Sequence, residues 1–196
     1  MWWLAAVVVI GVVAAAIIFF IKPSQPTVPP GLVEQREAIS RILDDANKIA
    51  DIDIRPLAEL EAKRNYRGAV SLLEQALAVN TAYEANVASL LTASNELAAL
   101  ASGVKPDALA VKARDAFGVL TKFAEAEKKF YGDRRALYEV TWSYYVDLAA
   151  KKKPAIPEGL QALVDAVNAD LQQARELRQQ FASALQAFDE AFAVAK

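Results

Sequence analysis

The densest group of chemically distinctive side chains in this sequence is aromatic and lies between residues 130 and 145. It comprises Phe130, Tyr131, Tyr138, Trp142, Tyr144 and Tyr145. On a helix, Tyr138, Trp142 and Tyr145 share one face, because residues three and four positions apart lie above one another. Tryptophan and tyrosine supply much of the binding energy at protein interfaces. We therefore predict a partner-binding surface at Tyr131, Tyr138, Trp142 and Tyr145; the alternative is that these rings pack inside a helical core.

Catalytic chemistry has few side chains available in this sequence. The chain contains no histidine and no cysteine, which removes the commonest general base, the commonest metal ligand and the thiolate nucleophile. A ferritin-like di-metal bundle, for example, requires Glu-x-x-His pairs, and P-loop and GxGxxG motifs are also absent. Glu125, Glu127 and Glu139 lie near tyrosines, so the catalytic alternative is an enzyme that uses only Asp and Glu. We predict a non-catalytic protein without a cofactor.

Acidic residues gather between positions 44 and 53, at Asp44, Asp45, Asp51 and Asp53. An EF-hand loop needs a third oxygen ligand, a central glycine and a terminal bidentate glutamate, and these are missing. The aspartates are therefore expected to be solvated, and no bound metal is predicted. The formal net charge of −2 argues against a nucleic-acid partner as well, because nucleic-acid-binding proteins concentrate positive charge on one face.

The most apolar stretch of the chain is MWWLAAVVVIGVVAAAIIFFI, residues 1–21. As a helix, residues 2–21 span about 30 Å, the thickness of the hydrocarbon core of a bilayer. The residues suited to the two membrane interfaces are Trp2, Trp3, Phe19, Phe20 and Lys22. The apolar run is longer than that of a signal peptide, and it ends in bulky residues where cleavage requires small ones. We predict a single-pass N-terminal membrane anchor.

The side of the membrane on which the body lies is weakly specified. Lys22 and Arg36 come after the span, and under the positive-inside rule they favour an internal body. Long domains, however, are translocated largely regardless of charge, and an anchor with almost no residues before it commonly exports the domain attached to its C-terminal end. We predict an exported body, on the periplasmic or extracellular side.

Residues 22–31, KPSQPTVPPG, contain four prolines. Proline fixes φ and disfavours helix at the preceding residue, so this Pro-rich linker is predicted to be an extended spacer of roughly 30 Å. Residues 32–196 are rich in strong helix formers and are predicted to form a helical bundle domain. Its first helix is expected from Leu32 to about Ala50, followed by a connection through residues 51–56.

Helical character then continues from Pro56 to about Ala101, as one long helix or with a break at Asn65 or Asn80. Two turns and two long helices complete the body. The first turn, Ser102–Asp107, opens a helix that we predict to pass Gly132 without a break and to end near Ala150. The second turn, residues 154–159, opens a helix from Glu158 to about Val194. Apolar residues repeat at helical spacings along both helices, which is typical of close antiparallel neighbours.

Residues 65–80, NYRGAVSLLEQALAVN, carry a recognisable pattern at Tyr66, Ala69, Ala76, Leu77 and Asn80. The segment resembles the end of the first helix and the whole second helix of a tetratricopeptide repeat, where these positions hold an aromatic, small packing alanines and a closing Leu and Asn. The resemblance implies a tight helical hairpin with a peptide-binding concave face. It covers only sixteen residues, and no second copy occurs at the 34-residue period. A generic amphipathic helix is the alternative.

The predicted fold class is all-α: a single N-terminal transmembrane helix, a Pro-rich spacer and an elongated antiparallel bundle of four helices, or five if the middle helix breaks. We predict a membrane-tethered scaffold or adaptor that contacts the bilayer through residues 2–21 and, through its body, another protein or a second copy of itself. Gly11 and Ala15 form one small-xxx-small pair of the kind found in dimerising spans. The alternatives are a component of a membrane sensor or secretion-type assembly and the Asp/Glu-only enzyme.

Overall fold

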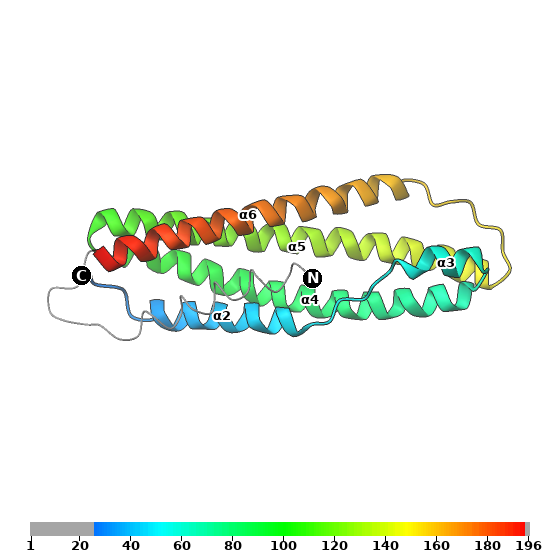
Figure 1. Ribbon diagram of the computed structural model, residues 1–196, viewed down its shortest axis with the longest axis horizontal. Helices are drawn as coiled ribbons and strands as arrows, with labels where there is room; N and C mark the ends of the chain where they lie inside the picture. The colour runs from blue at the N-terminus through cyan, green and yellow to red at the C-terminus, as the bar shows by residue number, and fades with distance from the viewer. Residues whose placement is uncertain (1–25, 195–196) are drawn as a thin grey trace. The chain divides into compact units, whose positions relative to one another are not determined.

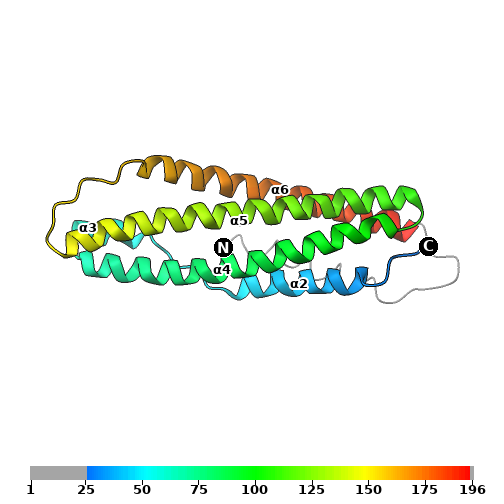
Figure 2. The same ribbon diagram turned by 180° about the vertical axis from the view of Figure 1, so that it is seen from behind.

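The computed structural model describes residues 26–194, which form helices joined by turns and loops (Figures 1 and 2). The helices are α2 (Leu32–Lys48), α3 (Pro56–Ala62), α4 (Tyr66–Leu100), α5 (Asp107–Ala149) and α6 (Leu160–Val194), with the short 3-10 helix η1 (Ala101–Gly103) between α4 and α5. No strand occurs within residues 26–194. The predicted all-α class is confirmed for these residues.

The predicted membrane anchor, residues 1–21, lies outside the described residues. The same holds for the proposed interface residues Trp2, Trp3, Phe19, Phe20 and Lys22. Among the helices between residues 26 and 194, none combines the length and the apolar character needed to cross a bilayer. The anchor therefore stays a prediction from the sequence.

The helix boundaries agree with the predicted ones except in the middle of the chain. Helix α5 passes Gly132 without a break, as predicted, and α2 and α6 differ from the expected bounds by two residues at one end. For residues 56–101 the sequence left open one helix or a break at Asn65 or Asn80, and the chain breaks before Tyr66. The body thus contains the fifth helix of the alternative with a break at Asn65.

Hydrogen bonds around Asn65 explain this break. Arg64 adopts a φ of +54°, and the N–H of Asn65 donates to the carbonyl oxygen of Leu60 at 2.8 Å, which is the pattern of a Schellman helix end. The side-chain Oδ1 of Asn65 then accepts from the N–H of Gly68 at 3.1 Å. Asparagine is one of the strongest N-cap residues, so Asn65 ends one helix and starts the next.

Helix α4 continues through Asn80 to Leu100. The tetratricopeptide-like segment is therefore not closed at Asn80, where that family would end its second helix. The helix directly before this segment, α3, has only seven residues. The alanines of the segment do allow close packing, since Ala69 and Ala76 are 0% and 3% exposed.

The described chain divides into two compact units, and unit 1 comprises residues 26–45, 89–124 and 176–194. It contains most of α2, the end of α4, the start of α5 and the end of α6. Its core centres on Phe117 and Phe188, whose rings meet edge to face with centroids 5.5 Å apart. Arg36 of α2 covers this core, pairing with Asp189 at 2.9 Å and lying over the Phe188 ring. The helical repeat predicted for α5 is buried here, at Leu109, Ala113, Ala116, Leu120 and Phe123.

The described part of the Pro-rich linker, residues 26–31, belongs to unit 1 and packs on its core. The N–H of Lys105 donates to the carbonyl oxygen of Thr27 at 2.9 Å, and Val28 packs on the core of the unit. Pro29 lies so close to Gly103 that a Cβ on that glycine would meet its ring at 2.6 Å. These contacts hold residues 27–29 on unit 1, and the extended spacer over residues 22–31 stays a prediction from the sequence.

Unit 2 comprises residues 46–88 and 125–175. Its main cluster joins α3, α4 and α5 around Leu73, Tyr138 and Tyr145, and a smaller cluster joins α4 and α5 to Val167 and Leu171 of α6. Helix α6 is also tied to α5 by Lys129, whose Nζ donates to the two carboxylate oxygens of buried Asp170 at 2.6 and 2.7 Å. Another Schellman end lies here among the described residues, with Lys151 at φ +59° closing α5.

Candidate functional site

An arginine is buried inside unit 2 among aromatic rings. The side chain of Arg134, on α5, is only 9% exposed. Its guanidinium carbon lies 4.7 Å from the ring centroid of Tyr131 and between 5.2 and 5.7 Å from three further centroids, those of Tyr83, Phe130 and Tyr138. These distances fall within the range of cation–π attraction. Four rings therefore replace part of the hydration that the buried charge has lost.

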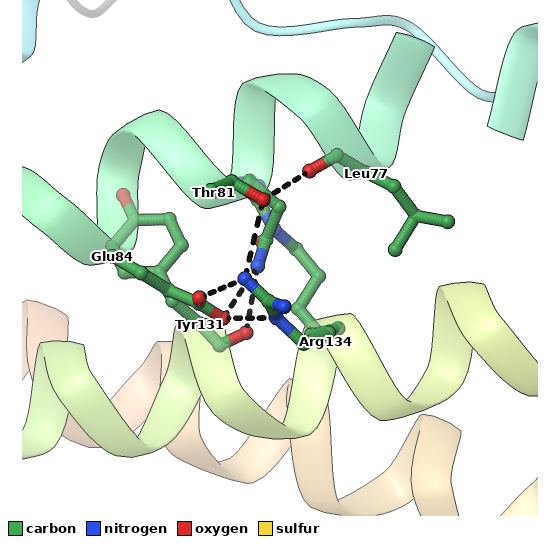
Figure 3. Close-up of polar contacts among 7 residues, drawn as sticks. Leu77, Thr81, Glu84, Tyr131 and Arg134 are labelled. Atoms are coloured by element: carbon green, nitrogen blue, oxygen red, sulfur yellow. Dashed lines mark hydrogen bonds and ion pairs between the residues drawn. The ribbon is translucent and has the colours of Figure 1, made fainter. Parts of the chain in front are cut away.

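Asn80 supplies the main hydrogen bond to this charge and ties α4 to α5. Its Oδ1 accepts from Arg134 Nε at 2.6 Å, and its Nδ2 donates to the carbonyl oxygen of Tyr131 at 2.9 Å. Asn80 itself is 0% exposed. Figure 3 shows these polar contacts bridging the two helices, with Leu77, Thr81 and Glu84 on α4 and Tyr131 and Arg134 on α5.

The neighbouring arginine completes the bridge at its solvent side. Arg135 Nε donates to Glu84 Oε1 at 2.8 Å, and its second nitrogen contacts both the other Glu84 oxygen and Thr81. Arg134 also reaches the carboxylate of exposed Asp51, at 3.5 Å. One Arg134 nitrogen, NH2, is buried without a hydrogen-bond partner. Since these groups pair only in one alignment, the network sets the register of α4 against α5.

The four predicted partner-binding residues differ in burial: three are buried and one is partly exposed. Tyr131, Tyr138 and Tyr145 are 9%, 6% and 5% exposed, so these three rings pack inside unit 2 as the core alternative expected. Trp142 is half-buried, and its Nε1 donates to Glu74 at 3.4 Å. In the aromatic group of residues 130–145, Trp142 and Tyr144 are partly exposed to solvent. The other four rings are buried in unit 2.

A groove of about 220 Å³ opens beside the buried tyrosines, entirely within unit 2. It is lined by Glu61 of α3, by Thr141, Tyr144 and Tyr145 of α5, by Ile156 and Pro157 of the following loop, and by Leu160 of α6. Ile156 is 75% exposed at its rim. Tyr145, one of the predicted site residues, is thus both a core residue and part of the groove wall.

The polar atoms of this groove are joined by hydrogen bonds. The Tyr145 hydroxyl donates to Glu61 Oε2 at 3.0 Å, and its ring meets that of Tyr144 edge to face at 5.5 Å and stacks on Tyr66 at 6.4 Å. Burial, followed by the hydrogen bond to Glu61, raises the pKa of Tyr145 to about 12. The groove therefore holds a neutral phenol beside a carboxylate.

This pKa predicts a stability change at high pH. Because the folded pKa of Tyr145 lies above the ordinary tyrosine value of about 10, the unfolded chain ionises first as the pH rises. The stability contributed by Tyr145 is therefore complete below about pH 10 and is lost between about pH 10 and 12. Tyrosinate absorbance during a pH titration should show a step near pH 12 that disappears in Tyr145→Phe. A Tyr145 step at an ordinary tyrosine pKa would contradict the buried, Glu61-bonded geometry.

The acidic residues of α5 and of the segment before α3 do not form a metal-binding group within residues 26–194. Glu125 and Glu139 are exposed on α5, and Asp53 is held by the backbone and guanidinium of Arg55. Within residues 26–194, no three His, Cys, Asp or Glu side chains converge on a point where they could hold a metal ion.

Two features of the site were missed in the sequence but had a signal there. Asn80 lies seven residues after Leu73 and seven before Val87 on the buried stripe of α4, and Arg134 lies four residues from Phe130 and from Tyr138 on that of α5. A polar side chain at such a position requires a buried partner. The groove had no comparable signal, because Glu61 and Tyr145 are 84 residues apart.

Comparisons of the chain with protein-family models, with curated proteins and with solved structures find no match. No family is therefore assigned to the chain.

Proposed function

We propose that this chain is a membrane-tethered, non-catalytic helical adaptor whose groove in unit 2 binds a partner protein. The supporting observation is Ile156, a large apolar side chain held 75% exposed at the rim of a groove walled by tyrosine, proline and leucine. Binding sites in proteins are concave and lined mainly by apolar and aromatic side chains with a few polar groups, as this groove is.

The size and lining of the groove favour a protein partner over a small-molecule substrate. A volume of about 220 Å³ is below the roughly 300–1,000 Å³ of sites that enclose a drug-sized ligand. It suits one or two side chains of a partner whose remaining contacts lie outside the groove. Its lining offers a single carboxylate, Glu61, whereas acid–base catalysis by carboxylates generally pairs two of them in different protonation states.

The tether rests on the apolar run of residues 1–21 and on the matching length of a bilayer-spanning helix. In this proposal the anchor holds the body at the membrane on the exported side. The linker contributes little reach, because residues 26–31 pack on unit 1 and the four residues 22–25 extend to about 14 Å at most. The adaptor would therefore act close to the bilayer surface.

The proposal is tested by cross-linking the full-length protein in its native membrane and purifying it in mild detergent. A specific partner should be captured by the unaltered chain and by Trp142→Ala, and it should be lost with Ile156→Asn and Tyr144→Ala. Ile156→Asn is the cleaner variant, since its side chain is exposed and carries little of the fold. Trp142→Ala is the matched control for Tyr144→Ala. Both residues are half-buried aromatic side chains of α5, but Trp142 does not line the groove.

Capture that survives the groove variants would place any partner elsewhere on the body. Cross-links that join only copies of this chain would replace the adaptor proposal with self-association. Separately, the protein should stay in the membrane fraction during alkaline extraction, and release under that treatment would contradict the anchor.

A further inference from the structure

We infer that the groove recognises a basic side chain, lysine or arginine, presented by the partner protein. The inference rests on the proposed adaptor function and deepens it by naming the chemistry of the bound group. It is carried by the polar atoms of the groove, by its aromatic faces and by its charge.

Two hydroxyl groups in the groove wall, those of Thr141 and Tyr145, already donate their hydrogen atoms to acceptors within the protein. The Thr141 hydroxyl donates to the carbonyl oxygen of Leu137 at 2.7 Å, and the Tyr145 hydroxyl donates to Glu61 at 3.0 Å. Each oxygen keeps lone pairs that can accept, and the Glu61 carboxylate has no donor of its own. A ligand group that donates several hydrogen bonds therefore fits, and ammonium and guanidinium groups are the side-chain groups with several donors and no acceptor.

The charge of the lining points the same way. Among the described residues that line the groove there is one carboxylate, Glu61, and no lysine or arginine. The described part of the lining thus presents one negative charge and no positive charge to an incoming group.

The shape of the groove suits a long basic side chain. The Tyr144 and Tyr145 rings meet at 68°, and aromatic faces attract cations. Ile156, Pro157 and Leu160 form the apolar remainder of the wall, against which the methylene stem of lysine or arginine can pack while its charged end reaches Glu61. The volume of about 220 Å³ equals roughly seven water molecules at about 30 Å³ each, enough for one such side chain.

The test uses the full-length protein in detergent and three short blocked peptides, Ac-Gly-X-Gly-NH2 with X as lysine, arginine or norleucine. Methyl NMR signals of Ile156 and Leu160 report binding. We expect the lysine and arginine peptides to shift these signals with dissociation constants in the millimolar range. The norleucine peptide keeps the stem without the charge, and its dissociation constant should be at least about fivefold higher.

The charge variant is Glu61→Gln, which keeps the size of the side chain and an acceptor for Tyr145. It should weaken the lysine and arginine peptides about fivefold and leave the norleucine peptide unchanged. The matched control is Glu59→Gln, the same change on the same helix at an exposed carboxylate outside the lining. It should bind all three peptides as the unaltered chain does.

Equal binding of the norleucine and lysine peptides, or lysine binding unaffected by Glu61→Gln, would overturn the inference. Shifts confined to signals outside the groove would overturn it too. If a partner is nevertheless captured, and is lost with Ile156→Asn, the adaptor proposal holds but the bound group is not a basic side chain. If the basic peptides bind but no partner is captured, the groove binds basic side chains and the adaptor proposal fails.

Discussion

Replacing Asn80 with leucine is expected to lower the free energy of unfolding by about 3–4 kcal/mol. Asn80 is fully buried and supplies the 2.6 Å hydrogen bond to the guanidinium of Arg134. Leucine has the same branched shape but no polar atoms, so the substitution leaves the buried charge with a distant carboxylate at 3.5 Å and removes the hydrogen bond from Asn80 to the carbonyl oxygen of Tyr131. Breaking a buried charge network by removing one partner costs far more than removing an exposed pair.

A double-mutant cycle separates this penalty from ordinary packing effects. Arg134→Met removes the charge and keeps an apolar chain among the four rings, so in the Asn80→Leu background it should restore a large part of the lost stability. Unfolding of the full-length protein by urea, followed by circular dichroism, gives the four free energies. Additive losses in the two single variants and the double variant would show that Arg134 does not depend on Asn80.

Phe117→Ala is expected to cost about 4 kcal/mol, the second large effect. Phe117 is 0% exposed in the core of unit 1 and meets Phe188 edge to face. Removing the ring leaves a cavity between α5 and α6 that neighbouring side chains cannot fill completely, and it deletes the aromatic contact as well. Phe192→Ala, a half-buried phenylalanine of the same unit, is the matched control and should cost clearly less.

Amide hydrogen exchange on the full-length protein locates this loss. In Phe117→Ala, exchange should accelerate in residues 89–124 and 176–194, the segments of unit 1 that surround the cavity. Equal losses for Phe117→Ala and Phe192→Ala would mean that the core of unit 1 is less ordered than its burial indicates.

The helices were predictable from the sequence because their signals are local. The apolar stripe of α5 overrides Gly132, since one glycine costs only about 1 kcal/mol in a helix against the burial of Phe130 and Tyr138 on either side. The break at Asn65 was harder to choose, because asparagine serves equally as an N-cap and as a tolerated helical residue. Its capping bond to Gly68 decides the matter.

The candidate site was only partly predictable because it depends on which helix faces which. Periodicity places Tyr138, Trp142 and Tyr145 on one face of α5 but does not say that α3 and α4 cover it. The rings expected at a partner surface therefore include three that are buried. The groove residues Glu61, Ile156 and Leu160 come from a short helix, a loop and the start of α6, and only tertiary packing brings them together with Tyr145.

The most direct test of the adaptor account is site-specific photo-cross-linking in the native membrane. A photoreactive residue is placed at Ile156, on the rim of the groove, and for comparison at Val111, a 47% exposed apolar position of α5 in unit 1. The account predicts one defined adduct with another protein from position 156, weakened by Glu61→Gln and not by Glu59→Gln, and none from position 111. The same adducts from both positions, or none from position 156, would contradict the account.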